Sequence, residues 1–241
     1  WVDPAESGFD PAWHRILILE AAEELLQKSW DPSVLVEQAV RAIEELTSTE
    51  NLLSERLEEW EARRAPPSTD PGPESLVEPE VEAAREQLEA LRLQVSATRG
   101  ALEGAVERAM PHRAPNMVRL LGPLLAARLI SLAGGLQRLA RLPASTVQVL
   151  GAERAFFEHL RGRAPPPRHG LLFLHPSIQG ASRSRRGPLA RALAGKVSIA
   201  ARLDAAGSAV RPELLEGFEA RVREIESRPP RRKSRAQRAA T

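Results

Sequence analysis

The residues that could do chemistry in this 241-residue chain are five histidines, 32 carboxylates and 34 lysines and arginines, with no cysteine. The carboxylates follow helix-surface spacing, and the sequence holds no GxSxG, GxxxxGKS/T or GxGxxG motif. Without cysteine there is no disulfide framework and no thiolate zinc site. None of the histidines has HExxH or related metal-ligand spacing: His14, His112, His159, His169 and His175. We therefore expect no catalytic residue, metal site or cofactor, and we predict that the protein is not an enzyme.

Basic residues are distributed unevenly along the chain. Residues 1–110 hold 24 Asp and Glu against 10 Lys and Arg, a net charge of −14, whereas residues 111–241 hold 8 against 24, a net charge of +16. Such asymmetry predicts two modules with different partners. A basic module attracts polyanions, and nucleic acid is the commonest of these. The alternative is a soluble protein whose surface charge is merely uneven.

The stretch GAERAFFEHLRGRAPPPRHG, residues 151–170, concentrates the candidate nucleic-acid contacts. A guanidinium group pairs with phosphate in a planar fork and also stacks on bases. His169 follows three prolines, so its ring is placed on a rigid turn from which it could stack on an unpaired nucleotide. Gly151 lets the loop approach another surface closely. The arginines of this cluster are Arg154, Arg161, Arg163 and Arg168.

Residues on either side extend this candidate surface. We expect Gln148, Glu153 and Arg154 to hydrogen-bond a partner at this surface. The loop QGASRSRRGP supplies further backbone contacts to RNA through Arg183, Arg185 and Arg186.

Other residues of the same region have structural interpretations. Phe156 and Phe157 continue an apolar helix face and are expected in the core rather than as stacking platforms. His175 precedes proline in an apolar strip, which is typical of a packed structural histidine.

Helices must position these residues, and the acidic half reads as helical. Apolar periodicity predicts helices over 12–28, 33–63 and 78–110. The stretch APPSTDPGP, 65–73, breaks the pattern because proline removes donors and blocks helix. Two long polar helices joined by such a turn predict an antiparallel hairpin, an arm for dimerisation or partner binding. The alternative is two ordinary helices of a compact bundle.

The basic half begins with the strongly apolar stretch 115–140. Arg119 and Arg128 fall inside it and Gly122-Pro123 interrupts it, so we expect a buried helix pair rather than a membrane span. HGLLFLHP is expected to form an extended strip or a buried turn. Helices are also predicted around 144–161, 189–206 and 212–227, with Gly162 closing the first of them, and the arginine-rich end 228–241 is expected to be disordered.

Three segments in order, LPASTVQVLGAERAFFEHLRG, RHGLLFLHP and RGPLARALAGKVSIAARLDA, resemble the Nop domain, over about residues 114–227. LVEQAVRAIEELTSTENLLSERLEEW resembles the first arm of that family's coiled coil. The resemblance implies an all-α protein, with an antiparallel helical coiled-coil arm followed by a compact all-helical Nop domain. The implied domains are an N-terminal helix over 1–32, left from a missing or shortened N-terminal domain, the arm over 33–110, the Nop domain over 111–227 and a basic disordered tail over 228–241.

The family includes the archaeal Nop protein of box C/D ribonucleoproteins, its nucleolar relatives and a spliceosomal pre-mRNA-processing factor. The resemblance implies an RNA-binding scaffold that recognises a kink-turn guide RNA together with a small ribosomal-protein-like subunit. Such a scaffold supports guide-directed 2′-O-methylation of rRNA. It also implies a homodimer through the coiled coil. The short chain and the undivided motif set indicate an archaeal, cytoplasmic location, and the charged, interrupted apolar stretch indicates no membrane association.

This sequence departs from the family pattern. The fibrillarin-binding N-terminal domain looks missing, which puts fibrillarin recruitment in doubt. The coiled-coil tip looks short and proline-rich. Where the family reads GAEK-ALFR this chain reads GAER-AFFE, so Glu158 replaces a basic residue and would repel phosphate. Two alternatives stay open: a coiled-coil interaction protein with a protein-binding helical module, and a general RNA binder.

Overall fold

The computed structural model describes residues 11–29, 33–62, 78–163, 165–167 and 169–227. The chain forms two compact units, residues 1–35 and residues 36–241. Within the described ranges every regular element is a helix, which confirms the predicted all-α class. The predicted proline-rich break at 65–73 and the predicted disordered tail at 228–241 lie outside the described residues.

The three helices predicted in the acidic half are present. They are α1 (Pro11–Ser29), α2 (Ser33–Ala62) and α3 (Glu78–Arg113). The third runs three residues beyond the predicted end, through Pro111.

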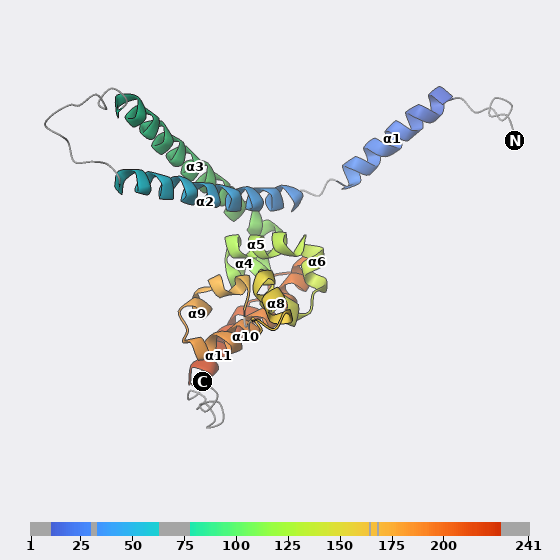
Figure 1. Ribbon diagram of the computed structural model, residues 1–241. Coiled ribbons are helices and arrows are strands. Elements are labelled where there is room, and N and C mark those ends of the chain that lie inside the picture. The colour runs from blue at the N-terminus through green and yellow to red at the C-terminus, as the bar shows by residue number, and fades with distance from the viewer. Residues whose placement is uncertain (1–10, 30–32, 63–77, 164, 168, 228–241) are drawn as a thin grey trace. The chain divides into compact units, whose positions relative to one another are not determined.

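Helices α2 and α3 run antiparallel, as Figure 1 shows. Midway along both helices, Arg99 Nε of α3 donates to a carboxylate oxygen of Glu50 in α2 at 2.8 Å. Towards the end of α2, residues 54–61 line one open groove with residues 85–92 of α3. The hydrogen bond from Arg99 holds the pKa of Glu50 below its ordinary value. A polar and ionic contact therefore joins the two helices near their middle.

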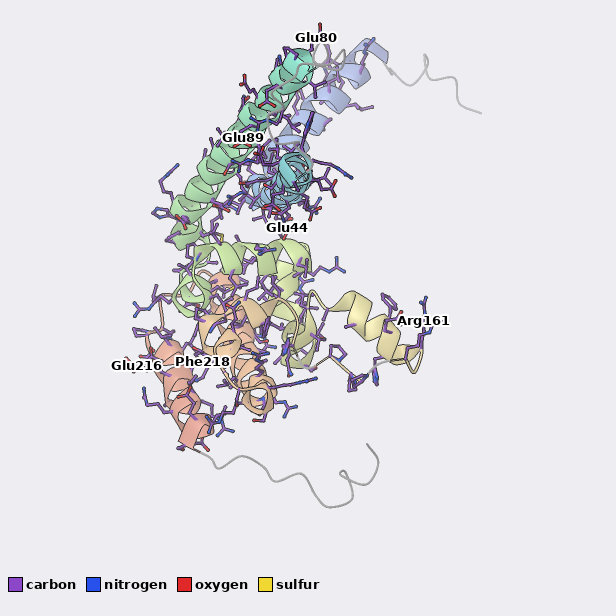
Figure 2. All side chains as sticks on the ribbon, turned by 60° about the vertical axis from the view of Figure 1, so that its left-hand side comes forward. Glu44, Glu80, Glu89, Arg161, Glu216 and Phe218 are labelled. Carbon is purple, nitrogen blue, oxygen red and sulfur yellow. The ribbon has the colours of Figure 1, made fainter. Side chains whose placement is uncertain are left out.

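The opposite ends of α2 and α3 belong to the main apolar core. Val40 of α2 and Val106 and Met110 of α3 are buried in one cluster with residues of the basic half. Arg128 of that half donates to a Glu44 carboxylate oxygen at 3.1 Å. Figure 2 shows Glu44 on the side of α2 that faces this body. The arm is thus anchored by burial as well as by an ion pair.

The basic half folds into short helices around one long one. These helices are α4 (Pro115–Leu121), α5 (Pro123–Ala133), α6 (Leu136–Arg141), α7 (Ala144–Val149), α8 (Glu153–Leu160), the 3-10 turn η2 (Leu171–Leu174), α9 (Pro176–Gln179), α10 (Arg183–Ala205) and α11 (Glu213–Ser227). HGLLFLHP therefore forms a turn rather than an extended strip. Its Leu172 is fully buried.

Helix α10 is the centre of this half and packs against α4, α6, α7, α9, η2 and α11. Its inward positions alternate large and small side chains: Leu189, Ala190, Leu193, Ala194, Val197, Ala200 and Ala201 are all fully buried. Alanines at close-packed positions let neighbouring helices approach the α10 backbone, while the leucines fill the gaps between them. One helix thereby organises several short helices that could not bury their own apolar faces alone.

The apolar stretch 115–140 forms a bent helix pair and a third short helix, as part of the core. Gly122, with φ +77°, and Pro123, the first residue of α5, separate α4 from α5. No single described helix has the length and apolarity of a membrane span, although α4 and α5 pass that test together while bent by 116°. Met117, Leu129 and other residues of the pair are buried in the core.

Asp204 near the end of α10 fixes the start of α4. One carboxylate oxygen accepts from the Asn116 backbone N–H at 3.0 Å and from Asn116 Nδ2 at 2.7 Å, and the other accepts from the Met117 N–H at 2.9 Å. Asn116 Oδ1 in turn accepts from the Arg211 N–H at 2.7 Å. The first N–H groups of a helix have no partner within the helix, so a carboxylate placed there satisfies them and complements the helix dipole. Segments about ninety residues apart in the chain are joined in this way.

We expect Asp204→Ala to lower the free energy of unfolding by about 2–4 kcal/mol, because three donors, two of them buried backbone N–H groups, lose their acceptor. Urea denaturation monitored by circular dichroism measures this. Asp204→Asn keeps one acceptor oxygen and is expected to lose less. A loss below about 0.5 kcal/mol for the alanine variant would contradict this role for the carboxylate.

His175 is the packed histidine that the sequence predicted. Its Nε2 lies 3.1 Å from the Leu120 carbonyl, its Nδ1 accepts from the Ser177 N–H at 3.3 Å, and its ring meets Phe218 edge-on with centroids 5.6 Å apart. These contacts require the neutral ring with its proton on Nε2, because Nδ1 must accept at the start of α9. Burial lowers the pKa of His175, and the hydrogen bond to Leu120 partly opposes the shift.

This lowered pKa makes stability depend on pH. The unfolded histidine binds a proton as the pH falls through about 6.5, whereas the folded histidine does so only at lower pH. The free energy of unfolding should therefore fall as the pH drops below about 6.5 and level off below the folded pKa. Urea midpoints measured across this range should fall more steeply for the native chain than for His175→Asn, which does not titrate and keeps a side-chain acceptor. Parallel curves would show that His175 does not cause the pH dependence.

Candidate nucleic-acid interface

Backbone hydrogen bonds join the residues just before the 151–170 stretch to the end of that stretch. The Gly170 N–H donates to the Gln148 carbonyl at 2.9 Å, and the Leu171 N–H donates to the Leu150 carbonyl at 2.7 Å. These bonds attach the segment after the prolines to the end of α7. The end of α7 and the segment carrying His169 therefore lie side by side, and the predicted role of Gln148, Gly151 and His169 in binding a partner stays a prediction.

Two glycines are required for this junction. A Cβ on Gly170 would lie 2.0 Å from the Leu150 carbonyl oxygen and 2.7 Å from the carbonyl carbons of Leu150 and Val149. Gly151 has φ +84°, and a Cβ there would lie 3.2 Å from Leu132 Cδ2 and 3.3 Å from Leu171 Cβ. Gly151 was predicted to allow approach to an outside surface. Its would-be Cβ meets the protein's own side chains, so internal packing explains this glycine.

His169 is stacked within the protein. Its ring lies parallel to Phe173, with centroids 4.7 Å apart and an interplanar angle of 19°. The Arg186 guanidinium carbon lies 5.1 Å from the centroid of the same Phe173 ring, in cation–π contact. Phe173 therefore connects two predicted contact residues, and it was not itself predicted. The spacing of four residues between His169 and Phe173 was the sequence signal that could have predicted this stack.

The basic loop predicted over 179–188 is partly wrong, because α10 already begins at Arg183. Pro188 lies inside this helix, where it removes one backbone donor. Arg186 stabilises this start, since its guanidinium donates to the carbonyls of Ala181 at 3.0 Å and Gln179 at 3.3 Å. Arg186 is thus mainly a positioning residue, whereas Arg183 is exposed and Arg185 half-buried in the first turn.

Arg161 and Arg163 lie at the end of α8, and Figure 2 shows Arg161 at the outer edge of the helical body. Both are highly exposed, and both pair with Glu158: the Arg161 NH1 lies 3.6 Å and the Arg163 NH1 3.9 Å from its carboxylate oxygens. The sequence predicted repulsion of phosphate by Glu158. The structure adds that Glu158 is also the ion-pair partner of two predicted phosphate contacts.

The remaining predicted residues are only partly described. Glu153 and Arg154 are the first two residues of α8, but their side chains lie outside the described part of the structure, as does the whole of Arg168. Phe157 was predicted in the core and is 58% exposed, so that prediction is wrong.

This arrangement is suited to binding rather than to bond-making. It offers exposed guanidinium groups, an aromatic stack and a surface held in place by backbone hydrogen bonds. Among the described residues, no group of three His, Cys, Asp or Glu side chains could hold a metal ion.

Comparison with known proteins identifies the family. Residues 37–225 match the Nop family, described as "snoRNA binding domain, fibrillarin", and the chain belongs to this family. An uncharacterized NOP5 family protein of Methanocaldococcus jannaschii is 52% identical over 126 residues, 52% of this chain and 30% of the relative. Nucleolar protein 58 of Scheffersomyces stipitis is 34% identical over 193 residues, 80% of this chain and 36% of the relative.

A solved structure is also similar. A chain in the crystal structure of a fibrillarin/Nop5p complex has a TM-score of 0.62 and 32% identity to this chain, and the match covers 88% of this chain and 79% of that one. The predicted Nop resemblance and all-α class are thus confirmed. The chain spans only about a third of the length of the two curated relatives above.

The glycine junction gives a testable consequence. We expect Gly170→Ala to lower the free energy of unfolding by about 2–3 kcal/mol, because its Cβ would meet unyielding backbone of Leu150. Gly195→Ala, on α10 with open space around its Cβ, is the matched control and is expected to be neutral or to stabilise by up to about 1 kcal/mol. Thermal and urea unfolding measure both. Equal behaviour of the two variants would refute the close approach at Gly170.

Proposed function

We propose that the protein is an RNA-binding scaffold of a box C/D-type ribonucleoprotein, which recognises a kink-turn RNA already bound by a small ribosomal-protein-like subunit. In that role it supports guide-RNA-directed 2′-O-methylation of rRNA without doing the chemistry itself. The proposal is supported by membership of a family described as a snoRNA binding domain. It also draws on the relative named nucleolar protein 58.

The observation that carries the proposal is the surface formed by the end of α7, the His169 segment and the start of α10. Backbone hydrogen bonds join the first two, and Phe173 and Arg186 join the second to the third. Arginines on a surface that does not have to reorganise can bind phosphates at low entropic cost. A surface with both charged and aromatic side chains suits a combined RNA and protein target better than a bare duplex.

Other partners follow from the same proposal. Fibrillarin is a candidate because the similar solved structure is a fibrillarin complex. A homodimer through α2 and α3 and a cytoplasmic, archaeal location stay predictions from the sequence.

Electrophoretic mobility shift at fixed salt tests the proposal, with a kink-turn RNA in the presence and absence of the small subunit. We expect a discrete further shift only when the subunit is present. Arg183→Ala should weaken this assembly about tenfold and reduce the salt dependence by about one phosphate contact. His169→Ala should also weaken it while leaving helicity unchanged in circular dichroism.

Arg223→Ala, an exposed arginine of α11, is the matched control and should leave both quantities unchanged. Tight binding to RNA regardless of the subunit would instead favour a general RNA binder. The absence of any shift would favour a protein-interaction module.

A further inference from the structure

We propose that Glu158 is a specificity-determining residue: it is a fixed counter-charge that keeps Arg161 and Arg163 from binding polyanions indiscriminately. The inference rests on the proposed function only in assigning these two arginines to an RNA-binding surface. A phosphate that engages them competes with the Glu158 carboxylate, so a phosphate that other contacts also hold there is favoured.

The end of α8 places the three residues together. The Arg163 N–H donates to the Glu158 carbonyl at 2.9 Å and the Gly162 N–H to the His159 carbonyl at 2.9 Å, the two hydrogen bonds of a Schellman cap. Gly162 has φ +70°, the left-handed conformation that this cap requires. The cap turns the chain back, so that Arg163 returns to the turn of helix that carries Glu158.

Helical spacing brings the second arginine to the same carboxylate. Arg161 follows Glu158 by three residues, a spacing at which helix-surface side chains are neighbours. One carboxylate thus lies 3.6 Å from one guanidinium and 3.9 Å from the other. Arg161 and Arg163 also lie at the negative end of the helix dipole, which favours their presence there without any nucleic acid.

Arg183, another arginine of the proposed surface, has a different electrostatic environment. Arg183 is exposed at the start of α10, and no described carboxylate lies within ion-pair distance of it. The surface therefore contains at least one cation ready for phosphate and two whose charge is partly neutralised. Cancelling a local charge weakens attraction to every polyanion, whereas a correctly docked partner compensates through its other contacts.

The inference is tested with a plain RNA duplex as the probe, at fixed salt. Glu158→Gln keeps the shape of the side chain and removes its charge. It should bind the plain duplex about three- to tenfold more tightly than the native chain, with a salt slope steeper by one to two contacts. Its affinity for the kink-turn RNA with the small subunit should change less. The preference of this variant for the kink-turn complex over the plain duplex should therefore fall.

Glu216→Gln is the matched control, since Glu216 is an exposed carboxylate of α11 on the far side of the body from Arg161 (Figure 2). It should not change duplex affinity. In an Arg161→Gln/Arg163→Gln background, Glu158→Gln should have no effect on it either. An effect that persists there would show that Glu158 only repels phosphate directly and would overturn the inference.

These experiments distinguish a failure of the inference from a failure of the proposed function. An unchanged duplex affinity of Glu158→Gln in the native background also overturns the inference. If no variant assembles with the kink-turn complex while Glu158→Gln still tightens binding to the plain duplex, the proposed function fails and the counter-charge at α8 stands.

Discussion

The rest of the basic half depends on the carboxylate of Asp204. It lies in the last turns of the central helix and accepts three hydrogen bonds at the first turn of α4. A buried carboxylate is costly unless it is fully hydrogen-bonded, so its partners cannot be displaced independently. Asn116 extends the network to Arg211 in the segment that leads into α11. Helices that are too short to be stable alone thus acquire fixed positions around α10.

The candidate interface is built in a comparable way, by main-chain groups rather than by the side chains that would touch a ligand. The Gln148 and Leu150 carbonyls position the His169 segment, and carbonyls of the α9–α10 turn position Arg186. Backbone carbonyls position the segments that carry the ligand-facing side chains. The shape of the surface therefore does not depend on which side chains it presents. The exposed arginines can therefore be substituted without loss of the surface that carries them.

Much of this organisation could be predicted from the sequence. Apolar spacing identified the long helices, and Gly162 marked the end of α8, because these signals are local. The start of α10 was missed because the small, polar and basic residues of 179–188 are typical of a loop, whereas Arg186 donates to carbonyls five and seven residues earlier. The exposure of Phe157 was missed because apolar periodicity reports an apolar face and cannot report whether another helix covers it. The pairing of Asn116 with Asp204, 88 residues apart, leaves no local signal at all.

Helix α10 carries both a residue of the candidate interface and the Asp204 carboxylate. Arg183 stands at one end and Asp204 near the other, about 32 Å apart along an unbroken helix. The interior positions between them are filled by side chains that tolerate little change in volume. Transplanting the interface onto another scaffold would therefore require carrying the whole helix and its neighbours, and new binding preferences along α10 must arise at its outward positions.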